Sequence, residues 1–202
     1  MQSAISIPIA AVLIAIPAAT VVLDHPRVRV FRTTDASLTG VDRGPGVVIA
    51  LDGGAGQTTG TAVWMDDVAS RPALAPGGSW IIVQPRRVAA PMVPAPAPLP
   101  APVPKPGEPP FTGITFNPLF ENDRVRVVRA RMDAGAREAF HTHAADTVLV
   151  HLSGGEIEDT ANGKTIVNRW ARGDVEFEAR GSSHSARNLG KAVDVFLVAL
   201  KP

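Results

Sequence analysis

The 202-residue sequence contains no cysteine. Disulfides, zinc sites built from thiolates and catalysis by a thiol nucleophile are therefore excluded. A dominant sign of charge is also missing, because 20 Lys and Arg residues face 19 Asp and Glu residues, a formal net charge of +1. Since no run rich in Lys or Arg is present either, the sequence offers no electrostatic basis for binding nucleic acid.

Several enzyme signatures are absent as well. The sequence has no GxSxG-type nucleophile elbow, no phosphate-binding GxxxxGK[ST] loop and no dinucleotide-binding fingerprint. It also has no long pattern of helical periodicity, while it contains 18 glycines and 19 prolines. This combination favours an all-β fold.

The first 23 residues, MQSAISIPIAAVLIAIPAATVVL, carry no charged side chain. The apolar run Ile9–Ile16 is shorter than the ~20 residues of a membrane-spanning helix but suits the core of a signal peptide. Small residues at Ala18 and Ala19 would permit cleavage. We expect residues 1–20 to be a signal peptide, and the processed protein to be periplasmic or extracellular with no stable membrane insertion. The usual basic start of a signal peptide is missing, so a cytoplasmic protein is the alternative.

Residues 88–110 consist mainly of Pro, Ala and Val, with ten prolines between Pro91 and Pro110. Proline fixes φ and removes the backbone donor, so this segment cannot join a helix or a sheet. We expect an extended linker that divides the chain into residues 21–87 and 111–202.

The two parts resemble one another in four segments that occur in the same order. The paired segments are DHPRVRVFRT (24–33) with ENDRVRVVRA (121–130), VVIALDGG (47–54) with VLVHLSGG (148–155), WMDDV (64–68) with WARGDV (170–175), and SWIIVQPR (79–86) with DVFLVALKP (194–202). Duplication of one domain explains this order better than chance. Short alternating strands separated by Gly-rich turns, including the hairpin signal Asn162-Gly163, predict two small antiparallel barrels or sandwiches.

His141 and His143 are the most conspicuous pair of candidate ligands. In an extended strand, residues two apart point to the same face, so both imidazoles can converge on one metal ion. An isolated HxH pair is weak evidence, because many such pairs are only hydrogen-bonded. A third nearby histidine, His151, lies four residues beyond Thr147, about 13 Å along a strand. That separation excludes His151 from the same site.

The context of the pair resembles the cupin family. Gly135, five residues, His141-Thr142-His143, three residues, Thr147, six residues and Gly154 resemble the first cupin signature except at one position. The stretch GDVEFEARGSSHSARN (173–188) resembles the second, with Ala179 where proline is usual. The resemblance covers about residues 122–199, and reaches residues 21–87 only through the internal repeat.

The resemblance implies a jelly-roll β-barrel, and two such barrels for the whole chain: a degenerate one over residues 21–87, joined by the Pro-rich linker to one over 111–202. It also implies a divalent metal held by His141, His143 and His184. The family's glutamate ligand falls on Thr147, whose neutral hydroxyl is a poor ligand. Asp146 would need a local bulge to point inward.

Three neutral imidazoles suit several divalent metals, so Fe, Zn, Mn, Ni and Cu all remain candidates. Without a carboxylate the site would keep a net charge of +2, which favours a small anionic partner. Some cupins related to the thiol dioxygenases use three histidines on iron. Thr147, Asp146 and Asn188 are the expected lining residues of the pocket.

Two functions stay open at this point. The first is a metal-dependent oxidoreductase or dioxygenase acting on a small molecule, with no catalytic residue identified beyond the metal ligands. The second is a non-catalytic ligand-binding or structural barrel with a vestigial site. Glu156, Glu158, Glu176 and Glu178 alternate with apolar residues and are interpreted as solvent-facing. The N-terminal half has one histidine, His25, and no metal site is expected there. Because cupin barrels commonly pair, the resemblance implies pairing of the two barrels within one chain, and the long linker would also permit exchange between chains in a homodimer.

Overall fold

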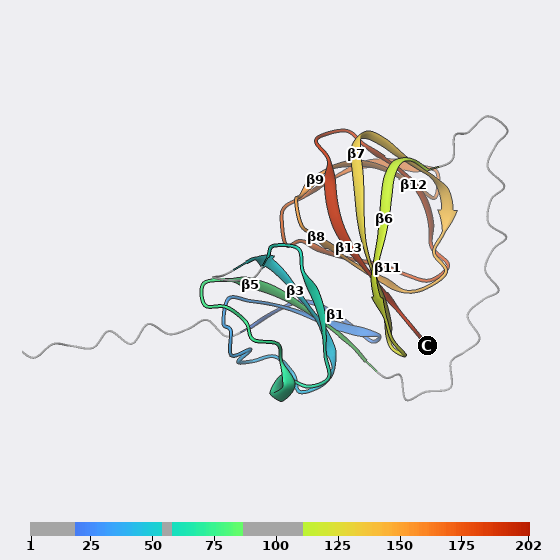
Figure 1. Ribbon diagram of the computed structural model, residues 1–202. Coiled ribbons are helices and arrows are strands. Elements are labelled where there is room, and N and C mark those ends of the chain that lie inside the picture. The colour runs from blue at the N-terminus through green and yellow to red at the C-terminus, as the bar shows by residue number, and fades with distance from the viewer. Residues whose placement is uncertain (1–18, 54–57, 87–110) are drawn as a thin grey trace, which may run out of the picture.

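The computed structural model describes residues 19–53, 58–86 and 111–202. These residues form two antiparallel sheets, shown in Figure 1. Most of the predicted signal peptide and the whole predicted linker lie outside the described residues, so both remain predictions. Within the described ranges, no helix is long and apolar enough to cross a membrane.

The N-terminal half forms a five-stranded sheet with the order β1-β2-β5-β3-β4. The order differs from the order along the chain because β5 inserts between β2 and β3 and pairs with both. The strands are β1 (Thr20–His25), β2 (Val28–Thr33), β3 (Gly46–Asp52), β4 (Ala62–Met65) and β5 (Ser79–Pro85). A 3₁₀ turn, η1 (Val68–Ser70), follows β4.

This sheet is open, whereas the sequence predicted a second closed barrel. Both of its faces are covered. On one face, Phe31, Trp80 and Ile82 pack with Leu38 and Met65. The opposite face packs against the C-terminal half. Burial on both sides explains why VVIALD is apolar throughout instead of alternating with polar residues.

The C-terminal half forms an eight-stranded antiparallel sheet with the order β10-β9-β12-β7-β13-β8-β11, and β6 pairs with β7 outside this path. The strands are β6 (Thr112–Glu121), β7 (Val125–Thr142), β8 (Thr147–His151), β9 (Gly155–Ala161), β10 (Lys164–Trp170), β11 (Val175–Glu178), β12 (Ser183–Asn188) and β13 (Val193–Leu200). The predicted hairpin at Asn162-Gly163 joins β9 to β10, and both residues have positive φ, 52° and 72°.

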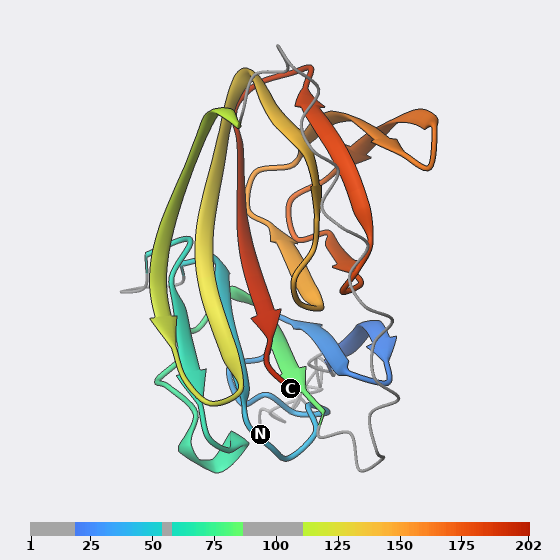
Figure 2. The ribbon, with the colours of Figure 1, turned by 90° about the vertical axis from the view of Figure 1, so that its right-hand side faces the viewer.

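The C-terminal sheet bends into two layers, and the long strand β7 belongs to both of them. Its first part pairs with β6 and β13, and its last part pairs with β12. Figure 2 shows β7, coloured yellow, running along one side of this curved sheet. In the strand order, β9, β10 and β12 lie on one side of β7, and β13 and β8 lie on the other. The expected barrel of residues 111–202 is therefore present as a curved antiparallel sheet with two layers.

Five C-terminal strands repeat the arrangement of the N-terminal sheet. By position in the sheet, the order β1-β2-β5-β3-β4 corresponds to β6-β7-β13-β8-β11, although the matched segments place Trp64 in β4 and Trp170 in β10. The C-terminal half adds β9, β10 and β12, which form the second layer around the cavity. Among the described residues of the N-terminal half, no strands correspond to these three, so this half has one layer and encloses no equivalent cavity.

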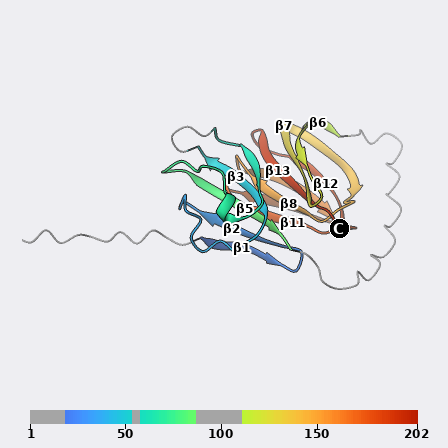
Figure 3. The same ribbon diagram turned by 60° about the horizontal axis from the view of Figure 1, so that its bottom comes forward.

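The two halves share one hydrophobic core. Val30, Ile49 and Val83 from the N-terminal sheet pack in the same cluster as Val148 and Phe196 from the C-terminal sheet. Figure 3 shows the N-terminal sheet, coloured blue to green, lying against the strands β8, β11 and β13. One face of the C-terminal sheet is thus covered by the N-terminal half, which leaves its other face to form the cavity.

Alternation along β8 assigns its side chains to these two environments. Val148 and Val150 are fully buried in the shared core. Thr147, Leu149 and His151 point the other way and line the cavity. The alternation of a strand therefore separates the residues that hold the halves together from those available for function.

Candidate metal centre

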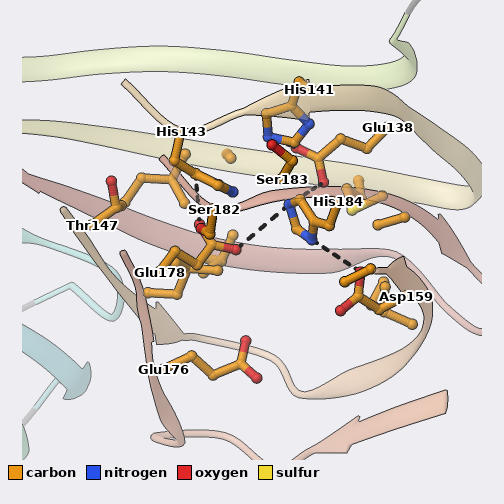
Figure 4. A pocket seen from close by; sticks show the side chains of 18 of the residues that line it. Glu138, His141, His143, Thr147, Asp159, Glu176, Glu178, Ser182, Ser183 and His184 are labelled. Carbon is orange, nitrogen blue, oxygen red and sulfur yellow. Dashed lines mark hydrogen bonds and ion pairs between the residues drawn. The ribbon is translucent and has the colours of Figure 1, made fainter. Parts of the chain in front are cut away.

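The C-terminal half encloses a cavity of about 1170 Å³. Much of its wall is apolar, with contributions from Ile114, Met132, Leu149 and Leu197. Histidine and carboxylate side chains lie together along another part of the wall, as Figure 4 shows. A cavity with an apolar wall and a few convergent polar groups is typical of a small-molecule site.

His141, His143 and His184 come together in this cavity as the sequence predicted. Their ring centroids are 4.8, 4.8 and 4.9 Å apart. One nitrogen from each ring can be chosen so that all three lie within 4.8 Å of one another. The pairing of His184 with His141 across β12 and β7 brings the third histidine to the first two.

Hydrogen bonds fix the orientation of two of these rings. Nδ1 of His184 lies 3.0 Å from Oδ1 of Asp159, and Nδ1 of His141 lies 3.0 Å from the carbonyl oxygen of Ala139. Because a carbonyl oxygen or an ionised carboxylate only accepts, each Nδ1 carries a proton, and in the neutral tautomer each Nε2 presents its lone pair. Metal-ligating histidines are typically held in this manner.

Nε2 of His184 is the ring nitrogen of this residue that faces two carboxyl groups. This nitrogen is buried and makes no hydrogen bond within the described residues. Its neighbours are Oε1 of Glu178 at 3.8 Å and Oε2 of Glu138 at 3.9 Å. A buried ring nitrogen with no hydrogen-bond partner, beside two carboxyl groups, leaves a polar position that a cation can fill. The residues therefore fit a divalent metal ion.

His143 has the electronic state that metal binding requires. Burial, and then the neighbouring His141 and His184, lower the pKa of His143 to about 4. The ring is therefore neutral at neutral pH and has a free lone pair.

Two carboxylates that sequence analysis did not assign to the site border the histidines. Oε2 of Glu178 lies 3.3 Å from Nδ1 of His143, and Oε1 of Glu138 lies 3.7 Å from Nε2 of His141. Burial, followed by the nearby Glu138, Glu176 and Asp159, raises the pKa of Glu178 to about 8. A bound cation would offset the cost of keeping this carboxylate ionised.

The prediction that Glu176 and Glu178 face solvent is wrong. Their side chains are 32% and 20% exposed, and both line the cavity. In the ladder between β11 and β8, Glu178 pairs with Thr147 and Glu176 pairs with Leu149. Paired residues point to the same face, so both glutamates share the inward face of their partners.

Of the three residues that the sequence predicted to line the pocket, Thr147 lies in the cavity wall, whereas Asp146 and Asn188 do not. Thr147 is buried in the cavity wall and donates to the carbonyl oxygen of Ala145 at 3.2 Å. Asp146 instead pairs with Arg27 of the N-terminal half, at 3.2 Å, and accepts a hydrogen bond from the backbone N–H of Arg180. Because neighbouring residues in a strand point to opposite faces, Asp146 is directed away from the cavity.

Asn188 is also outside the cavity wall. Its side chain is buried, and its amide nitrogen donates to the carbonyl oxygens of Met132, Asp133 and Lys191. Asn188 therefore ties β12 to the turn after it and to β7, which is a structural role in place of the predicted pocket contact.

His151 lies outside the three-histidine cluster. Its ring is buried and stacks on Trp170 with the centroids 4.3 Å apart. The indole N–H of Trp170 donates to Oε1 of Glu176 at 2.6 Å, while Oε2 of Glu176 lies 3.5 Å from Nε2 of His151. These three residues form a separate polar group on the cavity wall.

No family model matches this chain, and no curated protein matches its sequence. Solved structures that are similar to it include a cupin domain from Bordetella pertussis Tohama I, at 21% identity and a TM-score of 0.42, covering 45% of this chain and 95% of that one. An RmlC-like cupin from Shewanella frigidimarina NCIMB 400 is similar at 21% identity and a TM-score of 0.38, covering 45% of this chain and 78% of that one. The polyketide cyclase RemF from Streptomyces resistomycificus is similar at 19% identity and a TM-score of 0.40, covering 46% of this chain and 69% of that one.

Proposed function

We propose that the C-terminal half is a cupin-type domain that binds one divalent metal ion through His141, His143 and His184, and that it acts as a metal-dependent oxidoreductase on a small molecule. The observation that carries this proposal is the buried Nε2 of His184, which lies between two carboxylates with no hydrogen-bond donor. A cation at this position satisfies the imidazole and both carboxylates together.

When bound, the metal would supply a Lewis-acidic centre with positions open to a small molecule. The chain's own residues prepare the place for it. Asp159 and the carbonyl of Ala139 hold two rings with their Nε2 atoms toward the centre. The apolar wall formed by Leu149, Leu197 and their neighbours limits water around a substrate. Glu138 lies beside the centre as a candidate proton acceptor, whereas sequence analysis identified none.

The charges in the cavity bear on the class of ligand. Glu138, Asp159, Glu176 and Glu178 all line it, whereas Arg126, 57% exposed, is the one Lys or Arg that the described part of the chain contributes to its wall. The expectation of an anionic partner assumed a site without carboxylates, and that premise does not hold. We propose instead a ligand that is neutral or cationic, with an apolar body that fits the wall.

Elemental analysis of protein purified without a metal-affinity tag tests the metal site. We expect close to one equivalent of a first-row metal per chain in the wild type and almost none in His141→Ala/His184→Ala. Circular dichroism and thermal unfolding establish that the variant is folded. Sub-stoichiometric metal that does not change in the variant would refute the site.

Oxygen consumption by the metal-loaded protein then separates an enzyme from a binding protein. Small thiols, amines and neutral alcohols form the test panel, together with small acids as the class that the cavity charges disfavour. Consumption above the level of the double variant with any member supports the oxidoreductase. Binding in calorimetry without any consumption would favour the non-catalytic alternative.

A further inference from the structure

We infer that Glu178 is the anionic ligand of this metal centre, supplied by β11 in place of the glutamate that the cupin resemblance puts at position 147. The inference rests on the proposed metal function and adds to it a fourth protein donor. The resemblance takes only a histidine, His184, from the stretch 173–188 and no carboxylate ligand. Glu178 belongs to this stretch, where it alternates with apolar residues in the segment VEFE.

The pairing of β11 with β8 makes this substitution sterically simple. Glu178 is paired directly with Thr147 in the antiparallel ladder. Residues paired in this way have their Cβ atoms about 4.5–5.5 Å apart on one face of the sheet. A glutamate side chain is long enough to cover that separation, so a carboxylate from position 178 can reach the space that a carboxylate from position 147 would fill.

The contacts of Glu178 point to the same role. Its two oxygens approach two different ring nitrogens, His143 Nδ1 at 3.3 Å and His184 Nε2 at 3.8 Å. Figure 4 shows the side chain reaching from β11 toward both histidines. Thr147 is unable to compete, because its neutral hydroxyl donates to the carbonyl oxygen of Ala145.

The other carboxylates of the cavity are less well placed. Asp159 is engaged with Nδ1 of His184, and Glu176 with the indole of Trp170. Glu138 and Glu178 each approach two of the histidines, but Glu138 comes only to 3.7 and 3.9 Å, whereas Glu178 comes to 3.3 and 3.8 Å. We therefore assign the ligand role to Glu178, and Glu138 serves as the matched comparison.

A carboxylate ligand changes both the charge and the selectivity of the site. With three neutral imidazoles and one carboxylate, a divalent ion retains a net charge of +1. Carboxylate oxygen suits Mn²⁺ and other hard ions, whereas imidazole alone suits Cu and Ni better. Loss of Glu178 should therefore weaken Mn²⁺ binding more than Ni²⁺ binding.

Calorimetric titration of the metal-free, full-length chain with MnCl₂ and NiCl₂ tests the assignment. Four proteins are compared: wild type, Glu178→Gln, Glu138→Gln and His184→Ala. We expect Glu178→Gln to weaken Mn²⁺ binding by more than about 30-fold and Ni²⁺ binding by less, since even residues outside the ligand set typically contribute 10–100-fold. Glu138→Gln should change Mn²⁺ binding by less than about tenfold, because Glu138 lies 3.7 and 3.9 Å from the nearest ring nitrogens and, within the described part of the chain, makes no hydrogen bond that orients a ligand.

The outcomes separate this inference from the proposed function. If Glu178→Gln binds Mn²⁺ like the wild type, or if both glutamine variants lose affinity equally, the assignment of Glu178 is overturned while the metal site stands. If His184→Ala binds both metals like the wild type, the three-histidine site itself fails. Thermal unfolding of each metal-free variant excludes a folding defect as the cause.

Discussion

His184 is paired directly with His141 across the ladder between β12 and β7. This relationship joins the two sequence signatures, because one backbone pairing positions ligands that are far apart along the chain. The centroids of the two rings are 4.8 Å apart, which is close enough for both rings to bind one ion. In the proposed metal centre, these two histidines are therefore positioned by a ladder of the sheet and not by a loop.

Removing the acceptor behind His184 should weaken metal binding although no ligand is lost. Asp159→Ala frees Nδ1 of His184, so the ring can rotate and change its tautomer. We expect the affinity for Zn²⁺ to fall by about 10–100-fold in a calorimetric titration. Asp133→Ala is the control, because Asp133 is exposed and pairs with Arg131 away from the centre. Equal effects of the two substitutions would contradict the orienting role of Asp159.

Moving the carboxylate back across the ladder should restore the site. In Thr147→Glu/Glu178→Gln, the new glutamate starts from the paired position on β8. We expect Mn²⁺ affinity to return to within about tenfold of the wild type, compared with a loss of more than about 30-fold in Glu178→Gln alone. The single variant Thr147→Glu controls for crowding by two glutamates. A double variant no better than Glu178→Gln would show that the two positions do not share one space.

The shared core predicts that the two halves unfold together. Phe196 is fully buried among residues of both halves. Phe196→Ala should cost about 3–5 kcal/mol of unfolding free energy, and tryptophan fluorescence and circular dichroism should give coincident transitions. Ile166→Ala, at a side chain that is 55% exposed, should change the unfolding free energy by no more than about 0.5 kcal/mol. Separate transitions for the two probes would argue against a common core.

Gly154 should tolerate substitution less well than Gly163, although both have positive φ, 70° and 72°. A Cβ atom at Gly154 would lie 2.6 Å from the carbonyl oxygen of Trp170, whereas one at Gly163 meets nothing within 4 Å. Gly163→Ala should therefore cost about 1–2 kcal/mol from backbone strain alone. Gly154→Ala should cost clearly more in the same chemical denaturation experiment. An equal loss of unfolding free energy in the two variants would mean that the backbone at Trp170 can shift to make room for the added Cβ atom.

Sequence patterns were sufficient for the all-β class, the hairpin at Asn162-Gly163 and the three histidines. These features depend on local spacing, on turn chemistry or on a motif with fixed intervals. The separation of His151 from the cluster also followed from distance along one strand. Each of these conclusions needs only one segment of chain or one family pattern.

The remaining features depend on which strands become neighbours. Glu178 alternates with apolar residues as a solvent-facing residue would, and only its pairing with Thr147 shows that it points inward. Asp146 forms an ion pair with Arg27, which lies more than a hundred residues away in the sequence. The open N-terminal sheet could not be inferred either, because burial against a second half produces the same apolar pattern as the inside of a barrel.

Anomalous diffraction from crystals of the full chain soaked in ZnCl₂, recorded at the zinc edge, tests the central claim most directly. The account predicts one dominant peak per chain, at about 2.0–2.2 Å from a ring nitrogen of His141, His143 and His184 and from an oxygen of Glu178. A dominant peak away from these histidines, or no ordered zinc in the cavity, would contradict it.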